Sequence, residues 1–267
     1  MHEPARHAPI TAPLFVEQSG AGTPLLLIHG LMVSGAMYQG VEPDLANRYH
    51  VIVPDLRGHG RSRALGGPYS VEQLAHDLAQ LLDDLEVDSA HVLGYSQGGA
   101  VAQQFARDYS KRVRGLILAC TYAYNMLSRR ERVEGMLAPS LVRILGMRRL
   151  ARLLFSGVGG GQRLPPETAR WLQEILAAND KTRMVAAVEA MKAFYSRPWL
   201  REITCPTLVI AGAEDTAVPM AHAHMLAQGI PGAQLRVVDG AGHTLIWTHT
   251  EIFVQVVEAF LSSVNRT

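Results

Sequence analysis

Residues 94–99 of this 267-residue chain have the sequence Gly94-Tyr95-Ser96-Gln97-Gly98-Gly99. They follow an apolar run at 90–93 and precede a helical pattern that extends to Tyr109. A G-x-S-x-G motif between a strand and a helix is typical of a nucleophile elbow, in which a strained turn exposes the serine hydroxyl. The helix N-terminus adds positive potential and the backbone N–H of Gln97 behind Ser96. The stretch therefore predicts a nucleophilic serine at the end of a strand.

Short apolar runs alternate with helical patterns along the chain. Strands buried on both faces of a parallel sheet have near-continuous apolar runs, whereas helices repeat apolar residues every three or four positions. The clearest helix runs from Ser70 to Leu85 and begins with a capping-box pattern, Ser70-x-x-Gln73. This alternation predicts an α/β fold with a doubly wound, mostly parallel sheet. The expected strands are 25–28, 51–53, 91–93, 116–118, 207–210 and 235–238.

One long segment, residues 124–203, interrupts this alternation. It contains helical stretches separated by Pro139, by a glycine-rich loop at 157–161 and by Pro165-Pro166. No convincing strand pattern occurs within it. We therefore predict a first part of the α/β core at 1–123, an inserted helical cap at 124–203 and a second part of the core at 204–267.

Three further segments supply the polar groups that a serine nucleophile needs. The loop after the strand 25–28 contains His29-Gly30-Leu31, and the N–H of Leu31 is a second candidate donor to an oxyanion, beside that of Gln97. Asp215 follows one later strand and His243 follows the next. The resulting order of serine, aspartate and histidine differs from the orders of chymotrypsin-like and subtilisin-like proteases.

With these motifs, the chain resembles the α/β-hydrolase-fold family over nearly its whole length, from Leu25 to Leu261. It is most similar to a branch that contains esterases, enol-lactonases and cofactor-free haloperoxidases or perhydrolases. The segments that carry the resemblance are Leu27-Ile28-His29-Gly30, Asp55-Leu56-Arg57-Gly58-His59-Gly60-Arg61-Ser62, residues 94–99, Pro206-Thr207-Leu208-Val209-Ile210-Ala211-Gly212, Gly212-Ala213-Glu214-Asp215 and Gly240-Ala241-Gly242-His243.

The resemblance implies that Ser96 is the nucleophile, His243 the general base and then acid, and Asp215 the residue that orients His243. A serine hydroxyl needs an adjacent base at neutral pH, and an imidazole can both accept and return the proton. A carboxylate fixes the imidazole tautomer and stabilises the imidazolium. Glu214 is an alternative acid, although Asp215 matches the family position, and we expect Asp239 to shape a turn.

Structural roles are the simpler interpretation of the other histidines and of the cysteine near the site. We expect His59 to brace its loop and Cys120 to be a small buried thiol. We expect His29 to order residues 29–35, which we call the oxyanion loop. His222 and His224 are two residues apart on a helix, a spacing that does not place both on one side. We therefore predict no metal site and no cofactor.

We predict a serine hydrolase that cleaves a carboxylic ester or a lactone through an acyl-Ser96 intermediate. Perhydrolase or haloperoxidase-type chemistry on the same triad is an alternative. Carbon–carbon-bond hydrolysis is another, although the loop 30–35 lacks the Gly-Pro-Gly sequence frequent in such hydrolases. Dehalogenases and epoxide hydrolases of the fold have aspartate at the position of Ser96, so neither activity is expected. A small-molecule receptor that retains the triad is an alternative from a different class.

Composition excludes several other classes of protein. The chain has 48% hydrophobic and 18% charged residues and a formal net charge of +1. These values are typical of a globular protein and provide no basic excess for nucleic-acid binding. The two cysteines cannot form a disulfide scaffold, residues 1–13 do not resemble a secretory signal, and no run approaches the ~20 apolar residues of a membrane-spanning helix. We therefore predict a cytoplasmic enzyme for a small ester or lactone, with no nucleic-acid or membrane contact, and leave its oligomeric state open.

The predicted cap is basic. Residues 124–203 contain 14 Lys and Arg against 7 Asp and Glu, and the rest of the chain 11 against 17, so a +7 cap meets a −6 core. A solvated surface that pairs with the core is the simplest interpretation; steering of anionic substrates and a membrane-surface helix at 141–155 are alternatives. The cap is expected to cover Ser96 and to line its pocket with Met126, Leu127, Met136, Leu137, Leu145, Trp171 and Phe194.

Overall fold

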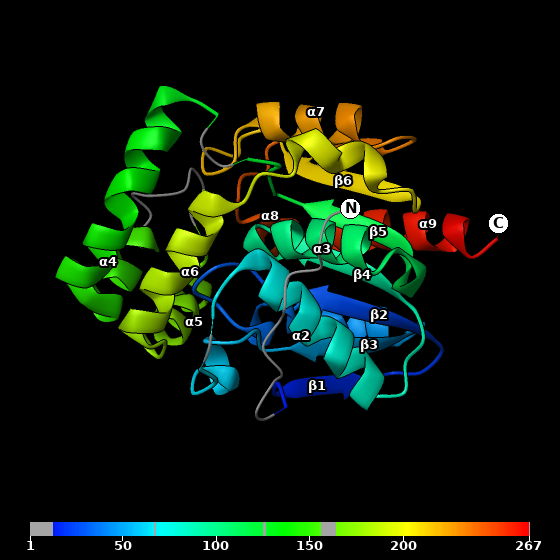
Figure 1. Ribbon diagram of the computed structural model, residues 1–267, viewed down its shortest axis with the longest axis horizontal. Coiled ribbons are helices and arrows are strands. Elements are labelled where there is room, and N and C mark those ends of the chain that lie inside the picture. The colour runs from blue at the N-terminus through cyan, green and yellow to red at the C-terminus, as the bar shows by residue number, and fades with distance from the viewer. Residues whose placement is uncertain (1–12, 67, 125–126, 156–163, 267) are drawn as a thin grey trace.

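A computed structural model describes residues 13–266, apart from 67, 125–126 and 156–163. The strands of its central sheet are β1 (Val16–Ser19), β2 (Thr23–Ile28), β3 (Tyr49–Pro54), β4 (Ala90–Tyr95), β5 (Val113–Ala119), β6 (Thr207–Gly212) and β7 (Gln234–Val238). Their order in the sheet is β1-β3-β2-β4-β5-β6-β7 (Figure 1). The neighbours from β3 to β7 are parallel, which confirms the predicted α/β fold. The strand order reverses direction between β2 and β4, the point at which ligands bind in open α/β sheets.

The edge strand β1 is the one strand of the described sheet that the sequence did not predict. It pairs antiparallel with β3, so that Val16 lies opposite Pro54 and Ser19 opposite Val51. Its residues are half-buried or exposed and alternate only weakly between apolar and polar. Pairing with the open edge of β3, rather than burial of its own side chains, therefore accounts for this strand.

Helices cover both faces of the sheet. They are α1 (Glu42–Ala46), α2 (Val71–Asp84), α3 (Gln97–Asp108), α7 (Met220–Gly229), α8 (Leu245–Thr248) and α9 (Thr250–Val264), with short 3-10 turns η1 (Gly35–Tyr38), η2 (Gly60–Ser62) and η3 (Ser110–Arg112). Leu26 and Ile28 of β2 pack in a cluster with α2, α3 and α7, whereas Leu25 and Leu27 pack on the opposite face with α1, α8 and α9. Because both faces are covered, the strands are near-continuous apolar runs. Within the described ranges, no helix is both long and apolar enough to cross a membrane.

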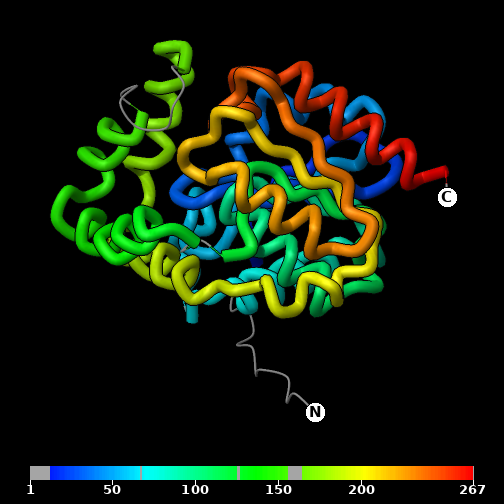
Figure 2. The backbone as a smooth tube through the Cα atoms, turned by 90° about the horizontal axis from the view of Figure 1, so that it is seen from above, coloured from blue at the N-terminus to red at the C-terminus, as the bar shows by residue number. Residues whose placement is uncertain are grey.

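The described chain between β5 and β6 is helical. It forms α4 (Arg129–Leu154), α5 (Pro166–Ala177), α6 (Lys181–Ala193) and the 3-10 turn η4 (Arg197–Glu202). We call residues 124–203 the cap segment. Helix α4 packs on α5 and α6, and Figures 1 and 2 place it at the outer edge of the molecule. Gly146, with a φ of 68°, divides α4 into two helical stretches.

Polar contacts join the cap segment to the rest of the fold near both of its ends. Near the start, the Glu131 side chain accepts a hydrogen bond from the backbone of Ser128 and pairs with buried His222 of α7. Near the end, the hydroxyl of buried Ser196 donates to Oε1 of Gln103 in α3 at 2.6 Å. These contacts fix where the cap segment leaves and re-enters the sheet.

The turn from β4 into α3 brings two stretches of backbone into close contact. A Cβ on Gly98 would lie 2.1 Å from the carbonyl oxygen of Ile28, and one on Gly94 would lie 2.2 Å from that of Gly98. Ser96 has a φ of 54° and a ψ of −119°, a conformation that L-residues rarely adopt. The glycines therefore allow α3 to start directly against β2 with Ser96 at the apex of the turn.

Replacement of Gly98 by alanine should destabilise the fold, because the new Cβ overlaps backbone that cannot rotate away. We expect Gly98→Ala to lower the free energy of unfolding by about 3 kcal/mol or more, measured by urea denaturation. Gly40→Ala is the matched control, since a Cβ there meets no atom within 4 Å. Equal stability of the two variants would show that the close contact is not a constraint.

Candidate active site

Three side chains form a continuous hydrogen-bonded relay at the carboxyl edge of the sheet. Ser96 lies between β4 and α3, Asp215 follows β6, and His243 follows β7. His243 Nε2 is 3.2 Å from Ser96 Oγ, and His243 Nδ1 is 2.8 Å from Asp215 Oδ2. The geometry suits transfer of the serine proton to an imidazole whose tautomer is held by a carboxylate.

Asp215 is held by its own loop. Its Oδ1 accepts hydrogen bonds from the backbone N–H groups of Ala217, at 2.9 Å, and Val218, at 2.7 Å. Its side chain is buried, whereas Glu214 and Asp239 are exposed. The structure therefore pairs Asp215, rather than either neighbouring carboxylate, with the imidazole.

The backbones of the serine and the histidine are also anchored. The Tyr95 hydroxyl donates to the carbonyl oxygen of His243 at 2.8 Å, and the Thr121 hydroxyl donates to that of Ser96 at 2.6 Å. Both donors come from positions next to strand ends, so the relay is tied to the rigid sheet rather than to mobile loops.

Cys120 adjoins this relay, and together with Asp215 and His243 it makes a possible set of metal ligands. The three ligand atoms lie within 4.8 Å of one another. Burial raises the pKa of the Cys120 thiol to about 12, so the thiol stays protonated at neutral pH, and both carboxylate oxygens of Asp215 already accept hydrogen bonds. Asp215 and His243 are thus already bonded within the relay, and the thiol would have to lose its proton to bind a metal.

The two predicted oxyanion donors follow β2 and β4, the strands on either side of the reversal point. Gln97 is the first residue of α3, so its N–H has no acceptor within the helix. Leu31 follows β2, and its N–H has no hydrogen bond to another described residue. A Cβ on Gly30 would lie 3.4 Å from Ser96 Cβ, which places this loop directly against the nucleophile. Met32 has a φ of 62°, unusual for a residue with a side chain.

A buried histidine holds the oxyanion loop in this shape. His29 Nε2 accepts a hydrogen bond from the Leu56 N–H at 2.9 Å, so His29 Nδ1 carries the proton and donates to the Gly30 carbonyl at 2.8 Å. Desolvation lowers the pKa of His29 and keeps its ring neutral. The ring of His59 lies 5.1 Å from that of His29, and burial followed by repulsion from His29 lowers the pKa of His59 to about 3.

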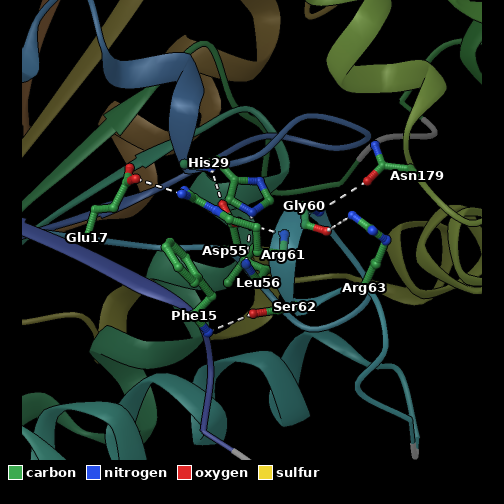
Figure 3. Close-up of polar contacts among 11 residues, drawn as sticks. Phe15, Glu17, His29, Asp55, Leu56, Gly60, Arg61, Ser62, Arg63 and Asn179 are labelled. Carbon is green, nitrogen blue, oxygen red and sulfur yellow. Dashed lines mark hydrogen bonds and ion pairs between the residues drawn. The ribbon is translucent and has the colours of Figure 1, made fainter.

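The loop between β3 and η2 holds the oxyanion loop through hydrogen bonds. Asp55 accepts a hydrogen bond from the Gly35 N–H on one carboxylate oxygen and bonds from the backbone and guanidinium of Arg61 on the other (Figure 3). Arg57 makes two parallel bonds, at 2.6 and 2.8 Å, to buried Asp77 of α2. Such bidentate pairs fix orientation as well as charge. The motif from Asp55 to Ser62 is therefore a structural support rather than a reactive group.

Comparison with known proteins identifies the family. The model of the alpha/beta hydrolase fold family matches residues 23–250. The chain belongs to this family. It is 34% identical to a poly(3-hydroxyalkanoate) depolymerase of Ectopseudomonas oleovorans over 90% of this chain and 84% of that one. A thermophilic esterase from Thermogutta terrifontis has 30% identity and a TM-score of 0.84, with 96% and 97% of the two chains covered. The enol-lactonase of Burkholderia xenovorans LB400 has 26% identity and a TM-score of 0.83, with 96% and 100% covered.

Asn179 is a residue of this alpha/beta hydrolase that the sequence analysis missed. It lies in the turn between α5 and α6, is buried, and reaches two loops of the core. Its Nδ2 donates to the Met32 carbonyl at 2.7 Å, and its Oδ1 accepts from the Gly60 N–H at 3.2 Å (Figure 3). One partner is an acceptor and the other a donor, and the amide satisfies both, because its nitrogen donates and its oxygen accepts. Asn179 therefore links the cap segment to the residue that follows Leu31.

Two of the predicted pocket residues lie away from the relay. Leu127 borders a surface hollow with Arg197 and His224, and Phe194 is packed in the core beside a cavity of about 400 Å³ between α6 and residues 57–72. Neither hollow includes a residue of the relay. Met126 falls outside the described residues.

The other predicted pocket residues differ in burial, because they lie on different faces of α4 and α5. Met136 and Leu137 are 65% and 52% exposed, because the buried face of α4 is formed by positions such as Val142. That they line the pocket over Ser96 stays a prediction. Leu145 packs in a cluster that includes Leu31 and Met32, and Trp171 packs against the apolar cluster on the α9 side of the sheet. Leu145 thus shares a cluster with residues of the oxyanion loop.

The Asn179 link should matter more for turnover than for stability, since it positions the Leu31 N–H. We expect Asn179→Ala to lower kcat for a p-nitrophenyl ester about tenfold while KM changes little, because a misplaced oxyanion donor affects the transition state most. Asn179→Asp should be at least as impaired, since a carboxylate oxygen then faces the Met32 carbonyl. The affinity for an arylboronic acid, whose tetrahedral adduct carries an oxyanion, should fall in parallel.

Ser196→Ala provides the control for this prediction. It also removes a buried hydrogen bond between the cap segment and the core, but its partners, Gln103 and Ala123, lie outside the oxyanion loop. We expect it to lower the melting temperature comparably and to leave kcat and boronate affinity near wild type. Equal losses of kcat in Ser196→Ala and Asn179→Ala would mean that Asn179 acts only through stability.

Stability should depend on pH through His59. Its pKa in the folded state, about 3, lies below that of the unfolded chain, so the unfolded chain binds more protons between about pH 6.5 and pH 3. Stability is therefore lost as the pH falls through this range. We expect the free energy of unfolding to decrease more from pH 7 to pH 5 in the wild type than in His59→Gln, measured by urea denaturation. Parallel pH profiles would contradict this.

Proposed function

We propose that this protein is a serine hydrolase that cleaves a carboxylic ester or a lactone through an acyl-Ser96 intermediate. The observation that carries the proposal is the relay from Ser96 through His243 to Asp215, built on a strained elbow between β4 and α3. Esterase and enol-lactonase relatives of the same fold support this class of substrate.

The geometry suggests how each step proceeds. His243 takes the proton of Ser96 as its oxygen attacks the acyl carbon, and Asp215 stabilises the imidazolium. The N–H groups of Leu31 and Gln97 bind the oxyanion, and the loss of one such donor typically costs ~10²–10³ in rate. His243 then protonates the leaving alcohol, which in a lactone stays attached to the acyl group. Water, activated by the same imidazole, releases the acid and restores Ser96.

The acyl step in this proposal can be tested by trapping and by kinetics. A fluorophosphonate should react at Ser96 with loss of fluoride, and peptide mass spectrometry should locate the adduct there. Ser96→Ala should lose the adduct and at least about 10³-fold in kcat with p-nitrophenyl acetate, while its circular dichroism is unchanged. Ser196→Ala, which replaces a serine outside the relay, should keep both. Wild-type turnover in Ser96→Ala would refute the proposal, and slow turnover with tight ligand binding in the wild type would favour a receptor.

A further inference from the structure

The outward face of α4 carries a stripe of apolar side chains. Its members are between 43% and 76% exposed and follow the spacing i, i+3, i+4, i+8 and i+11, which places them on one side of a helix. We call this set the α4 stripe: Val133, Met136, Leu137, Leu141 and Ile144. Val142 and Leu145 of the same helix instead pack in a cluster with residues of α5 and α6 and with Met32. The helix is therefore apolar on two sides, of which the fold buries one.

This concentration is specific to α4 and its immediate neighbourhood. Of the eleven large apolar side chains that are exposed in the described chain, eight lie between Leu127 and Leu154. Figures 1 and 2 both place α4 at the outer edge of the molecule. Grouped apolar side chains on a protein surface mark a contact with another molecule, whereas single ones need no explanation.

The charges around the α4 stripe are almost all positive. Helix α4 has seven arginines and two glutamates. Both glutamates already have partners, since Glu131 pairs with His222 and Glu134 with Arg130. Arg129, Arg132 and Arg143 of the same helix are exposed.

A second cluster of arginines lies at the other end of the helix. Arg148 and Arg152 of α4 and Arg170 of α5 line one open hollow of about 420 Å³, with Glu174 as its acidic residue. Within the described chain, none of these three arginines forms an ion pair. Converging guanidinium groups repel one another and suit an anion with several oxygens, such as a phosphate.

We propose that α4 docks this protein onto an anionic lipid surface, with the α4 stripe in the acyl-chain boundary and the arginines on lipid phosphates. Helices that lie in a membrane interface combine these two features, an apolar side and flanking cations. From the sequence we expected no membrane contact, with a surface helix at 141–155 as an alternative. In the structure the exposed stripe runs from Val133 to Ile144, so the proposed surface lies in the first helical stretch of α4 and begins before residue 141.

Charge argues against a second copy of this chain as the occupant. A two-fold contact between α4 helices would place the same arginine-rich surface on both sides of the interface. Like charges would then be buried face to face with few carboxylates to compensate them. A surface of negative headgroups supplies the missing charge and tolerates the irregular apolar stripe.

Vesicle flotation tests the proposal on the whole protein without any need for turnover. We expect the protein to float with vesicles of phosphatidylcholine and phosphatidylglycerol at least tenfold more than with phosphatidylcholine alone, and less at high salt. Met136→Gln/Ile144→Gln should abolish flotation, and Arg148→Gln/Arg152→Gln should reduce it to the level with neutral vesicles. Ile252→Gln, which changes an exposed apolar residue on α9, should float like the wild type.

Three results would overturn the proposal. The first is that the protein does not float with anionic vesicles, and the second is that it floats equally when the stripe is replaced. The third is that light scattering finds a dimer that Met136→Gln/Ile144→Gln dissociates, which would assign the stripe to a second copy. Circular dichroism and melting temperature establish that each variant is folded. Because flotation is independent of Ser96 chemistry, failure here leaves the proposed hydrolase function untouched, and loss of turnover in Ser96→Ala leaves this proposal untouched.

Discussion

The close contact between the start of α3 and the end of β2 governs the site. Gly98 lies so near the Ile28 carbonyl that no side chain fits between them. This contact forces the turn at Ser96 into a strained conformation and aims its hydroxyl out of the sheet edge. The same contact places the oxyanion loop, which continues from Ile28, directly beside the nucleophile. One steric constraint therefore sets the position of both the reacting oxygen and one of the proposed donors to the oxyanion.

Buried polar contacts then hold the loops around that contact. His29, Asp55 and Asn179 each form a hydrogen bond with the backbone of a loop other than their own. Each of the three is almost fully buried. A buried polar group that loses its partner is costly, so these contacts define one arrangement rather than several. The relay gains from this rigidity, because a displacement of about 1 Å in a catalytic group reduces the rate strongly.

Much of this architecture was predictable, for a physical reason. The strands and the elbow are encoded by short-range patterns: apolar runs where both faces of the sheet are covered, and glycines where backbones touch. The order of serine, aspartate and histidine follows because parallel strands end at the same edge. The strand β1 escaped prediction because its stability comes from pairing with β3 rather than from its own side chains. Asn179 escaped because its partner Met32 is 147 residues away, and no local pattern marks such a contact.

The amino-acid sequence alone determined the fold class, the elbow at Ser96 and the candidate partners Asp215 and His243, since each depends on local periodicity and on the residues that end a strand. Only the tertiary structure decided which carboxylate reaches the imidazole, how Asn179 ties the cap segment to the oxyanion loop, and which side of α4 faces outward. An amphipathic pattern specifies that a helix has an apolar side, but α4 has two. Which of them is buried depends on the shapes of α5, α6 and the oxyanion loop against which it packs.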